Sequence, residues 1–396
     1  MGLALERPDL KPASVYLHVP FCRRRCGYCN FSVITGRLDL APRIVDAMLA
    51  ELRQQVDEHP PRRPVETIFV GGGTPTQLGA EDWQRLAVGL GGLFVIDDAT
   101  EWTTEANPED FDRAMAANLA KVGVNRISFG VQSFQDRKLS TLQRGHTGRE
   151  AIAAINRAAE RFDNLSVDLI FGAPGETLAD WHGDLRTALS LPISHLSTYS
   201  LTIEKGTTFW NRDRRGELPR CDEDLDLAMY QAARSMASDH GMRQYEVSSF
   251  AVEGSRCRHN LAYWHGRDWY AAGPSATRFL GGVRSTAHRS VTTYLKRIEL
   301  GQSAVTDREP IDSLEYAAER MAFGLRMIDG VNLADVSRQT GIDLSRQFAV
   351  AIQRCRRSGW IRGDGDHLRL TERGILFADS VANEFLAVAL EVASGD

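Results

Sequence analysis

The chain has 396 residues, 43% of them hydrophobic, and a formal net charge of -5 from 47 Lys and Arg against 52 Asp and Glu. This length can bury a large core and predicts one big domain with a smaller one beside it. The acidic balance offers no basic field for nucleic acid, and no apolar run approaches the ~18 residues that span a bilayer. The first residues contain no apolar signal core, so we expect a cytoplasmic protein without a disulfide framework.

Short β-rich runs alternate with amphipathic helical stretches over the first 200 residues. Strands are predicted at residues 14–19, 65–70, 101–105, 125–129, 166–170 and 195–200. Helices are predicted between them at residues 41–58, 80–93, 108–122, 148–161 and 177–189. Repeated βα units predict a parallel sheet with right-handed crossovers. Six such units, with the unusual residues placed just after strands, favour an α/β fold of the partial (β/α)6, TIM-like barrel type over an open Rossmann sheet.

The sequence pattern changes after Leu201. The next predicted elements are a helix at 222–240, a strand at 244–248, a Gly/Pro/aromatic region at 254–282, a hairpin at 361–371 and a final helix from 372. From about residue 306 the chain is predicted to be mostly helical. We therefore expect a barrel domain with a following ligand-binding segment over 1–300, and a smaller winged-helix-like domain over 301–396. Without a basic recognition stripe, a structural or lid role is favoured for the smaller domain over DNA binding.

Three cysteines lie close together directly after the first predicted strand. Cys22, Cys26 and Cys29 form a C-x3-C-x2-C cluster, whereas the other three cysteines are scattered far downstream. Structural zinc usually takes four protein ligands, and the nearby nitrogen ligand, His18, lies inside the strand. A [4Fe–4S] cluster on three thiolates explains the spacing better, because its fourth iron is then free to bind a small molecule. Phe31 stands where a fourth thiolate could have been.

Glycines and polar residues follow the later strands, at the same predicted edge of the barrel. Residues 71–75 are Gly-Gly-Gly-Thr-Pro, and such consecutive glycines let backbone amides approach a ligand closely. No Gly-Lys-Ser/Thr sequence ends this loop, so a phosphate-binding P-loop is excluded. Glu105 ends the third strand, Gln132 follows the fourth, and Asp168 is polar within an apolar fifth strand. Although Asp168 alone could be a structurally hydrogen-bonded residue, the set predicts a pocket for a zwitterionic nucleoside.

These motifs together resemble a known family. The run from Tyr16 to Cys22, the other two clustered cysteines, the glycine loop and residues 105–108 and 123–132 are similar to the radical S-adenosylmethionine (radical SAM) proteins related to oxygen-independent coproporphyrinogen oxidase. The resemblance implies a [4Fe–4S] cluster whose free iron is chelated by the amino and carboxyl groups of S-adenosylmethionine. The contacts that it implies for this cofactor are Tyr16, Tyr28, Gly72, Gly73, Thr74, Glu105, Gln132, Arg144, Asp168 and Thr202. A surface arginine after a helix is the alternative interpretation of Arg144.

Two kinds of protein share that scaffold, the oxidases and a group of haem chaperones. This chain differs from the oxidase branch in two respects. The oxidase branch carries one more cysteine two residues beyond the third, where this chain has Phe31, and a longer segment before the first strand. In both respects the chain resembles the HemW-type haem chaperones. The run His259-Asn-x-x-Tyr263-Trp264 also resembles a motif of that branch, which implies an iron ligand in His259 and an aromatic wall in Tyr263 and Trp264. The alternative is a hydrogen-bonded core histidine with packing aromatics.

The resemblance therefore implies a haem chaperone that holds [4Fe–4S] and S-adenosylmethionine and delivers haem to an acceptor haemoprotein. That acceptor is expected to be membrane-associated, and a homodimer and an unidentified electron donor are the other expected partners. The alternative function is an oxygen-independent coproporphyrinogen III oxidase, which releases carbon dioxide from two propionate side chains. A radical enzyme acting on another substrate is a third interpretation, because the strand-end residues define the cofactor and hardly constrain a second ligand.

Overall fold

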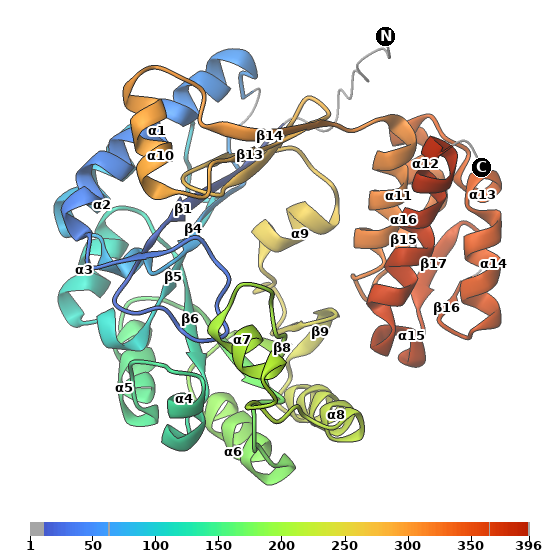
Figure 1. Ribbon diagram of the computed structural model, residues 1–396, viewed down its shortest axis with the longest axis horizontal. Coiled ribbons are helices and arrows are strands. Elements are labelled where there is room, and N and C mark those ends of the chain that lie inside the picture. Colours follow the sequence, from blue (N-terminus) through green and yellow to red (C-terminus); the bar gives the residue numbers. More distant parts are fainter. Residues whose placement is uncertain (1–11, 62–63, 364, 395–396) are drawn as a thin grey trace.

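The computed structural model describes residues 12–61, 64–363 and 365–394. The N-terminal residues that bear on a signal sequence, and residue 364 of the predicted hairpin at 361–371, lie outside the described residues. Figure 1 shows a curved sheet ringed by helices, with the C-terminal helices gathered as a separate group on one side. Among the described residues, no helix is both long enough and apolar enough to cross a membrane.

Six parallel strands form the centre of the sheet, in the order β1-β4-β5-β6-β7-β8. They are β1 (Ser14–Val19), β4 (Thr67–Gly72), β5 (Glu101–Ala106), β6 (Arg126–Gln132), β7 (Asn164–Phe171) and β8 (His195–Ser200). Most of their residues are buried, as expected for parallel strands covered on both faces. The predicted α/β barrel is confirmed, and β1 and β8 have the predicted bounds. The second predicted strand is shifted by two residues along the chain. Its ladder with β1 begins where Thr67 pairs with Ser14 and ends at Gly72, inside the glycine loop.

Additional strands extend the sheet on both sides to twelve strands. Beyond β1 lie β11 (Trp269–Ala272), β12 (Thr277–Leu280), β13 (Val283–Ala287) and β14 (Val305–Pro310). Beyond β8 lie β10 (Ser249–Ala251) and β9 (Arg243–Glu246). Over the described residues the sheet runs from β14 to β9 without these two strands pairing, so the barrel is partial. A separate parallel pair, β2 (Phe21–Cys22) and β3 (Ile34–Thr35), closes the ends of the cysteine loop.

Helices cover the outside of the parallel strands (Figure 1). They are α1 (Ala41–Glu58), α2 (Ala80–Gly91), α3 (Arg113–Lys121), α4 (Asp136–Thr141), α5 (Gly148–Ala159), α6 (Leu178–Leu189) and α8 (Glu223–Asp239). Helix α7 (Thr208–Arg214) instead lies against the cysteine loop, where the Phe209 amide donates to the Gly27 carbonyl oxygen at 2.9 Å. The third predicted helix begins later than expected. Residues 108–110 form a 3-10 turn, and the Asp112 side chain then accepts a hydrogen bond from the Met115 amide at 2.7 Å, which fixes the helix start. Residues 41–58 form a helix with the predicted bounds.

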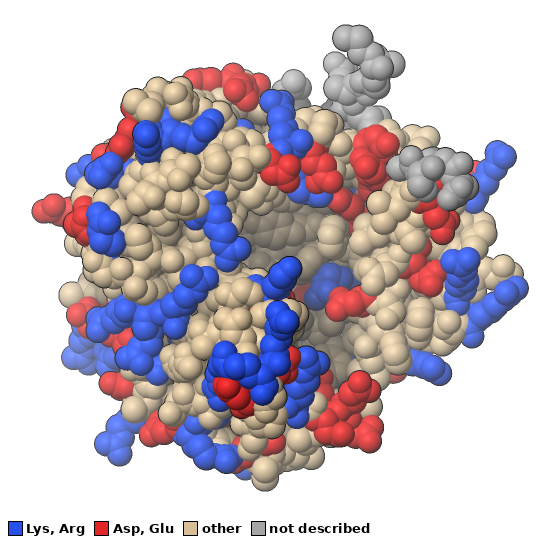
Figure 2. Space-filling view, in the orientation of Figure 1, with Lys and Arg blue, Asp and Glu red and all other residues tan. Residues whose placement is uncertain are grey.

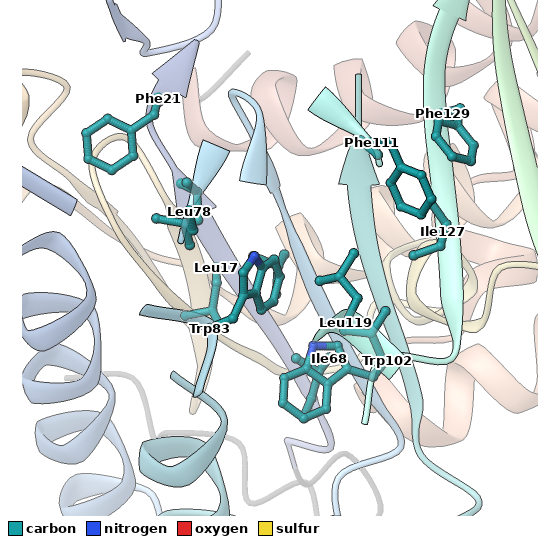
Figure 3. Packing of buried hydrophobic residues seen from close by; sticks show 14 of the residues in the cluster. Leu17, Phe21, Ile68, Leu78, Trp83, Trp102, Phe111, Leu119, Ile127 and Phe129 are labelled. Carbon is teal, nitrogen blue, oxygen red and sulfur yellow. The ribbon is translucent and has the colours of Figure 1, made fainter. Parts of the chain in front are cut away.

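The main hydrophobic core lies between these helices and the sheet. Figure 3 shows Trp83 of α2 beside Leu17 of β1, with Ile68 of β4, Trp102 of β5 and Leu119 of α3 close by. All five side chains are at most 3% exposed. Burying a large apolar side chain contributes about 1.5–3 kcal/mol relative to leaving it exposed. This packed layer holds in place the strands whose carboxyl ends carry the polar residues.

The C-terminal part has a hydrophobic core of its own, which includes Phe348 and Phe385. Its elements are α11 (Ser313–Gly324), β15 (Val331–Asn332), α12 (Leu333–Thr340), α13 (Leu344–Gln347), α14 (Ala349–Arg357), β16 (Ile361–Arg362), β17 (His367–Leu370), α15 (Glu372–Leu376) and α16 (Ala378–Ser394). The predicted mostly helical region with a hairpin is confirmed. Strand β14 still pairs with the main sheet, and the division of the chain near residue 300 stays a prediction.

Two further helices connect these parts. Helix α9 (Arg258–Trp264) carries the predicted haem motif and lies near the middle of the molecule, between the barrel strands and the C-terminal helices (Figure 1). Helix α10 (Val291–Glu299) packs against α1 on the outside of the barrel. The short α9 was not predicted as a helix, because its seven residues are too few to show a helical period.

Candidate cofactor and ligand sites

A cavity of about 500 Å³ opens where the parallel strands end. The three clustered cysteines line it. It is also lined by Tyr28, Gly72, Gly73, Thr74, Glu105, Gln132, Arg144, Asp168 and Thr202. The structure thus brings together every predicted S-adenosylmethionine contact except Tyr16, which lines a second cavity. The parallel strands place these residues at one edge because their carboxyl ends all point the same way.

The three cysteines carry free, half-buried thiols; Cys22 ends β2, and Cys26 and Cys29 lie on the loop between β2 and β3. The Thr74 hydroxyl donates to Cys22 Sγ at 3.5 Å, and Arg144 Nη1 donates to Cys26 Sγ at 3.5 Å. Burial raises the pKa of Cys22 to about 11, so binding of a metal there must displace its proton. Among the described residues, no three His, Cys, Asp or Glu side chains group closely enough to hold a single metal ion. In an iron–sulfur cluster each thiolate binds a different iron, so wider sulfur spacing is compatible with it.

The His18 side chain lies behind the cysteine loop and does not face the thiols. Its Nε2 is 2.9 Å from the Ser32 carbonyl oxygen, and its Nδ1 is 3.1 Å from the Tyr16 hydroxyl. The side chain is buried, and burial lowers its pKa. Both ring nitrogens therefore have partners, and His18 braces the loop that carries the cysteines instead of adding a fourth ligand.

The glycine loop needs glycine at two positions. Gly72 has φ +101°, and a Cβ there would collide with the ring of His18. A Cβ on Gly73 would lie 2.6 Å from the Phe21 carbonyl oxygen. The Gly72 amide donates to Glu105 Oε2 at 2.9 Å, which joins the loop to the next strand. The loop thus lies directly on the cysteine segment, with no side chain between the two backbones.

Asn107 connects the parts of this cavity and was not predicted as a site residue. Its Nδ2 donates to Thr74 Oγ1 at 2.8 Å, and its Oδ1 accepts from Arg144 Nη2 at 2.6 Å. The same nitrogen of Arg144 donates to the Gly130 carbonyl oxygen at 2.5 Å. The available signal was the position of Asn107, two residues after Glu105 at a strand end.

Two residues of this cavity carry marks of a bound polar group. Gln132 is a non-glycine residue at φ +68°, a backbone conformation that costs free energy and that clusters at ligand sites. Arg144 is not an exposed surface arginine, and its buried Nε has no hydrogen-bond partner among the described residues. A carboxylate in the cavity would satisfy such a donor.

Glu105 and Asp168 bring two carboxyl groups into the same enclosed space. Burial raises the pKa of Glu105 to about 7, although the Gly72 amide opposes the shift, and the nearby Asp168 adds to it. Burial also raises the pKa of Asp168, which accepts from Ser128 Oγ at 3.2 Å. Both acids would be stabilised in their charged form by a cationic ligand, such as an ammonium group.

A change of pH should therefore alter the stability of the metal-free protein through Glu105. The pKa of Glu105 in the folded protein lies above the ordinary value of 4.5. Above pH 4.5 the unfolded chain therefore releases this proton more readily than the folded protein does. We expect this group to lower the free energy of unfolding by on the order of 2 kcal/mol as pH rises from 4.5 to 7. Urea unfolding at both pH values should show a smaller decrease for Glu105→Gln than for the wild type. An unaltered decrease in Glu105→Gln would contradict the assignment, and Glu81→Gln, an exposed change on α2, is the control.

A second cavity of about 400 Å³ lies beside α9 and α11. The residues that line it include Tyr16, Tyr263, Trp264, Trp269, Phe279, Arg284, Tyr316, Arg320 and Phe323. Two of the three predicted haem residues, Tyr263 and Trp264, are thus in this lining. The aromatic lining differs from the polar lining of the first cavity.

His259 lies behind this lining and is 1% exposed. Its Nδ1 is 2.8 Å from Thr67 Oγ1, and its Nε2 is 2.8 Å from the Tyr263 hydroxyl. The Glu101 carboxylate accepts from the amides of Arg258 and His259 at 3.1 and 3.2 Å, which fixes the start of α9. Burial lowers the pKa of His259 to about 3, so the ring is neutral. Ligation of iron by His259 would require one of its two hydrogen bonds to open.

Comparison with known proteins agrees with this arrangement. A model of the Radical SAM superfamily matches residues 16–188, and a model of the HemN C-terminal domain matches residues 311–377. The heme chaperone HemW of Bacillus subtilis (strain 168) is 33% identical over 94% of this chain and 99% of its own length. The heme chaperone HemW of Mycobacterium tuberculosis (strain H37Rv) is 36% identical over 95% of each chain. The chain belongs to the HemW family of radical SAM proteins.

The fold is also that of a solved structure in the wider family. Coproporphyrinogen III oxidase (HemN) from Escherichia coli superposes with a TM-score of 0.84 over 96% of this chain and 92% of that chain. The two are 21% identical, a level at which the likeness establishes the fold alone. Membership of the radical SAM superfamily implies a [4Fe–4S] cluster and S-adenosylmethionine. The three free thiols, the glycine loop and the unpartnered Arg144 Nε fit such groups, while the role of each residue stays a prediction.

Proposed function

We propose that this protein is a haem chaperone, which carries haem and transfers it to an acceptor haemoprotein without acting as a coproporphyrinogen oxidase. The observation that carries the proposal is Phe31, which lines the cysteine cavity at the position where the oxidase branch has a further cysteine. The near-full-length similarity to heme chaperones in two bacteria supports it. The cavity itself has room for the cofactors of a radical SAM protein.

In this proposal Cys22, Cys26 and Cys29 hold the cluster, and the first cavity holds S-adenosylmethionine. When bound, the cluster supplies an electron that can cleave the sulfonium bond of S-adenosylmethionine. Arg144 would orient the carboxylate of the methionine part, and Glu105 would accept from an ammonium or a ribose hydroxyl. The chain would also exclude water from the first cavity. His18 supports this closure, because its ring contacts both the cysteine loop and the glycine loop.

Haem would bind near α9, where Tyr263 and Trp264 line the second cavity. The Tyr263 hydroxyl holds His259 Nε2 at 2.8 Å, so iron ligation by His259 would follow release of this hydrogen bond. The acceptor haemoprotein, its association with a membrane, a homodimer and the electron donor stay predictions from the family resemblance. The division into a barrel domain and a C-terminal domain near residue 300 stays a prediction as well.

Two assays on one anaerobically reconstituted sample test the proposal. We expect haem titration to give a saturable change in absorbance, and coproporphyrinogen with S-adenosylmethionine and reductant to give no protoporphyrinogen. Haem uptake no greater than that of an unrelated protein would contradict the chaperone function. Measurable conversion of coproporphyrinogen would instead favour the oxidase and would show that a cysteine at position 31 is dispensable. A Cys26→Ser sample controls for turnover that does not depend on the cluster.

A further inference from the structure

The second cavity has walls from two distant parts of the sequence. Helix α9 and the strands β11 to β13 form one side, and α11, which begins the C-terminal part, forms the other. Figure 2 shows the surface hollowed between the barrel and the C-terminal helices, in the region where Figure 1 places α9 and α11. Phe323 of α11 is 38% exposed, so the cavity can be reached from solvent on that side.

Aromatic rings follow one another along this cavity. The ring of Trp269 lies 4.8 Å from that of Tyr263 and 5.7 Å from that of Phe279. Phe279 stacks on Tyr316 of α11 at 6.1 Å with an interplanar angle of 18°. Trp264 and Phe323 form a further pair across α9 and α11 at 6.4 Å. Such a lining favours a flat, largely apolar ligand.

One charged side chain in this lining lacks a counter-ion in the part of the chain that the structure describes. Arg320 of α11 is only 6% exposed, and its Nη1 donates to the Trp264 carbonyl oxygen at 2.8 Å. Its Nε has no hydrogen-bond partner, and Arg320 makes no ion pair among the described residues. The neighbouring Glu319 is already bound by Arg284, whose Nη2 is 2.6 Å from both carboxylate oxygens. Burial lowers the pKa of Arg320, and the positive charge of Arg267 acts in the same direction.

A buried guanidinium without a carboxylate is costly, and the cost is removed when an anion binds beside it. Arg320 lines an aromatic cavity, and its buried Nε is a donor without a partner among the described residues. The ligand that suits both features is a planar aromatic molecule that carries a carboxylate. Arginine is well suited to such a group, because its planar donors match the two oxygens of a carboxylate.

We propose that this cavity binds the porphyrin ring and that Arg320 pairs with one of its propionate carboxylates. This inference rests on the proposed haem-carrying function and assigns Arg320 a role at the site beside α9. The ligand would be enclosed between α9 and α11, so the C-terminal part would contribute directly to binding.

The test compares haem with its dimethyl ester, in which both propionate charges are absent. We expect the wild-type protein to bind haem about tenfold more tightly than the ester, because a hydrogen bond to a charged group is lost with the ester. In Arg320→Met both ligands should bind with the affinity that the wild type has for the ester. Arg308→Met, which changes an exposed arginine on β14, should keep the full preference.

The outcomes separate this inference from the proposed function. Equal wild-type affinity for haem and its ester, or a preference that survives in Arg320→Met, would overturn the inference and leave haem binding in place. Metal-free protoporphyrin provides a second probe by fluorescence. If protoporphyrin binds in an Arg320-dependent way but haem does not bind, the porphyrin site is supported and the chaperone function is overturned. If neither ligand binds, the inference and the chaperone function are both overturned. The ester comparison in the wild type remains decisive if Arg320→Met does not fold.

Discussion

Replacing Cys26 with serine is expected to abolish the iron–sulfur absorbance of anaerobically reconstituted protein. The iron content should fall from about four atoms per chain towards background, because two thiolates alone cannot hold a [4Fe–4S] cluster. The same result is expected for Cys22 and Cys29, since all three thiols line one cavity. The fold should persist, because the thiols are only half-buried and none of them belongs to the hydrophobic core. Iron assay, visible absorbance and circular dichroism measure these three properties.

Cys221→Ser is the matched control for this experiment. Cys221 is also half-buried and free, but it does not line the cysteine cavity. Its replacement should leave iron content and absorbance at wild-type values. An unchanged iron content in Cys26→Ser would contradict the proposed ligand set. Loss of helical signal in the same variant would mean that the cysteine has a structural role as well.

Gly72→Ala is expected to have the next largest effect, on both stability and S-adenosylmethionine binding. A side chain at φ +101° is strained, and its Cβ would collide with the buried His18 ring, which is held by two hydrogen bonds. We expect a loss of about 3 kcal/mol in the free energy of unfolding. The Gly72 amide would also move away from Glu105, so S-adenosylmethionine affinity should fall at least tenfold. Urea unfolding and calorimetric titration measure the two effects.

Gly79→Ala provides the comparison for the glycine loop. Gly79 lies just before α2 with φ -70°, and the nearest atom to an added Cβ is Asp82 Oδ2 at 3.9 Å. This alanine should change neither stability nor S-adenosylmethionine affinity by more than the error of measurement. Equal behaviour of the two variants would show that the contact between the glycine loop and His18 is not needed. It would also remove the physical reason given for the glycines at this strand end.

The sequence predicted the barrel well because its signals are local. The strands at residues 14–19 and 195–200 and the helix at 41–58 have the predicted bounds. Each is encoded by a short run of buried residues or an amphipathic period. The strands from 243 to 310 were mostly not predicted individually. They are only three to six residues long, and five of them, β9, β10, β12, β13 and β14, form only antiparallel pairs at the ends of the sheet, where neighbouring strands decide the pairing.

The residues of the first cavity were largely predictable, because each stands at a strand end. Asn107 was missed, since its two hydrogen bonds join segments that are 33 and 37 residues away along the chain. The predicted contact Tyr16 lines the second cavity instead of the first. Tyr16 lies on β1 as predicted. Its ring packs near that of His259 on α9, however, and the packing of α9 decides which of the two cavities Tyr16 lines.

The sequence by itself determined the cysteine spacing, the βα order and the glycine loop, because each depends on residues close together in the chain. Only the tertiary structure decided that His18 closes the space above Gly72, and that Thr67 and Tyr263 occupy both nitrogens of His259. It alone placed Arg320 opposite α9 with no counter-ion among the described residues. The His259–Tyr263 pair is local, at four residues apart, whereas the other contacts join segments 54 to 192 residues apart. They arise when packed elements exclude water and no local pattern specifies them.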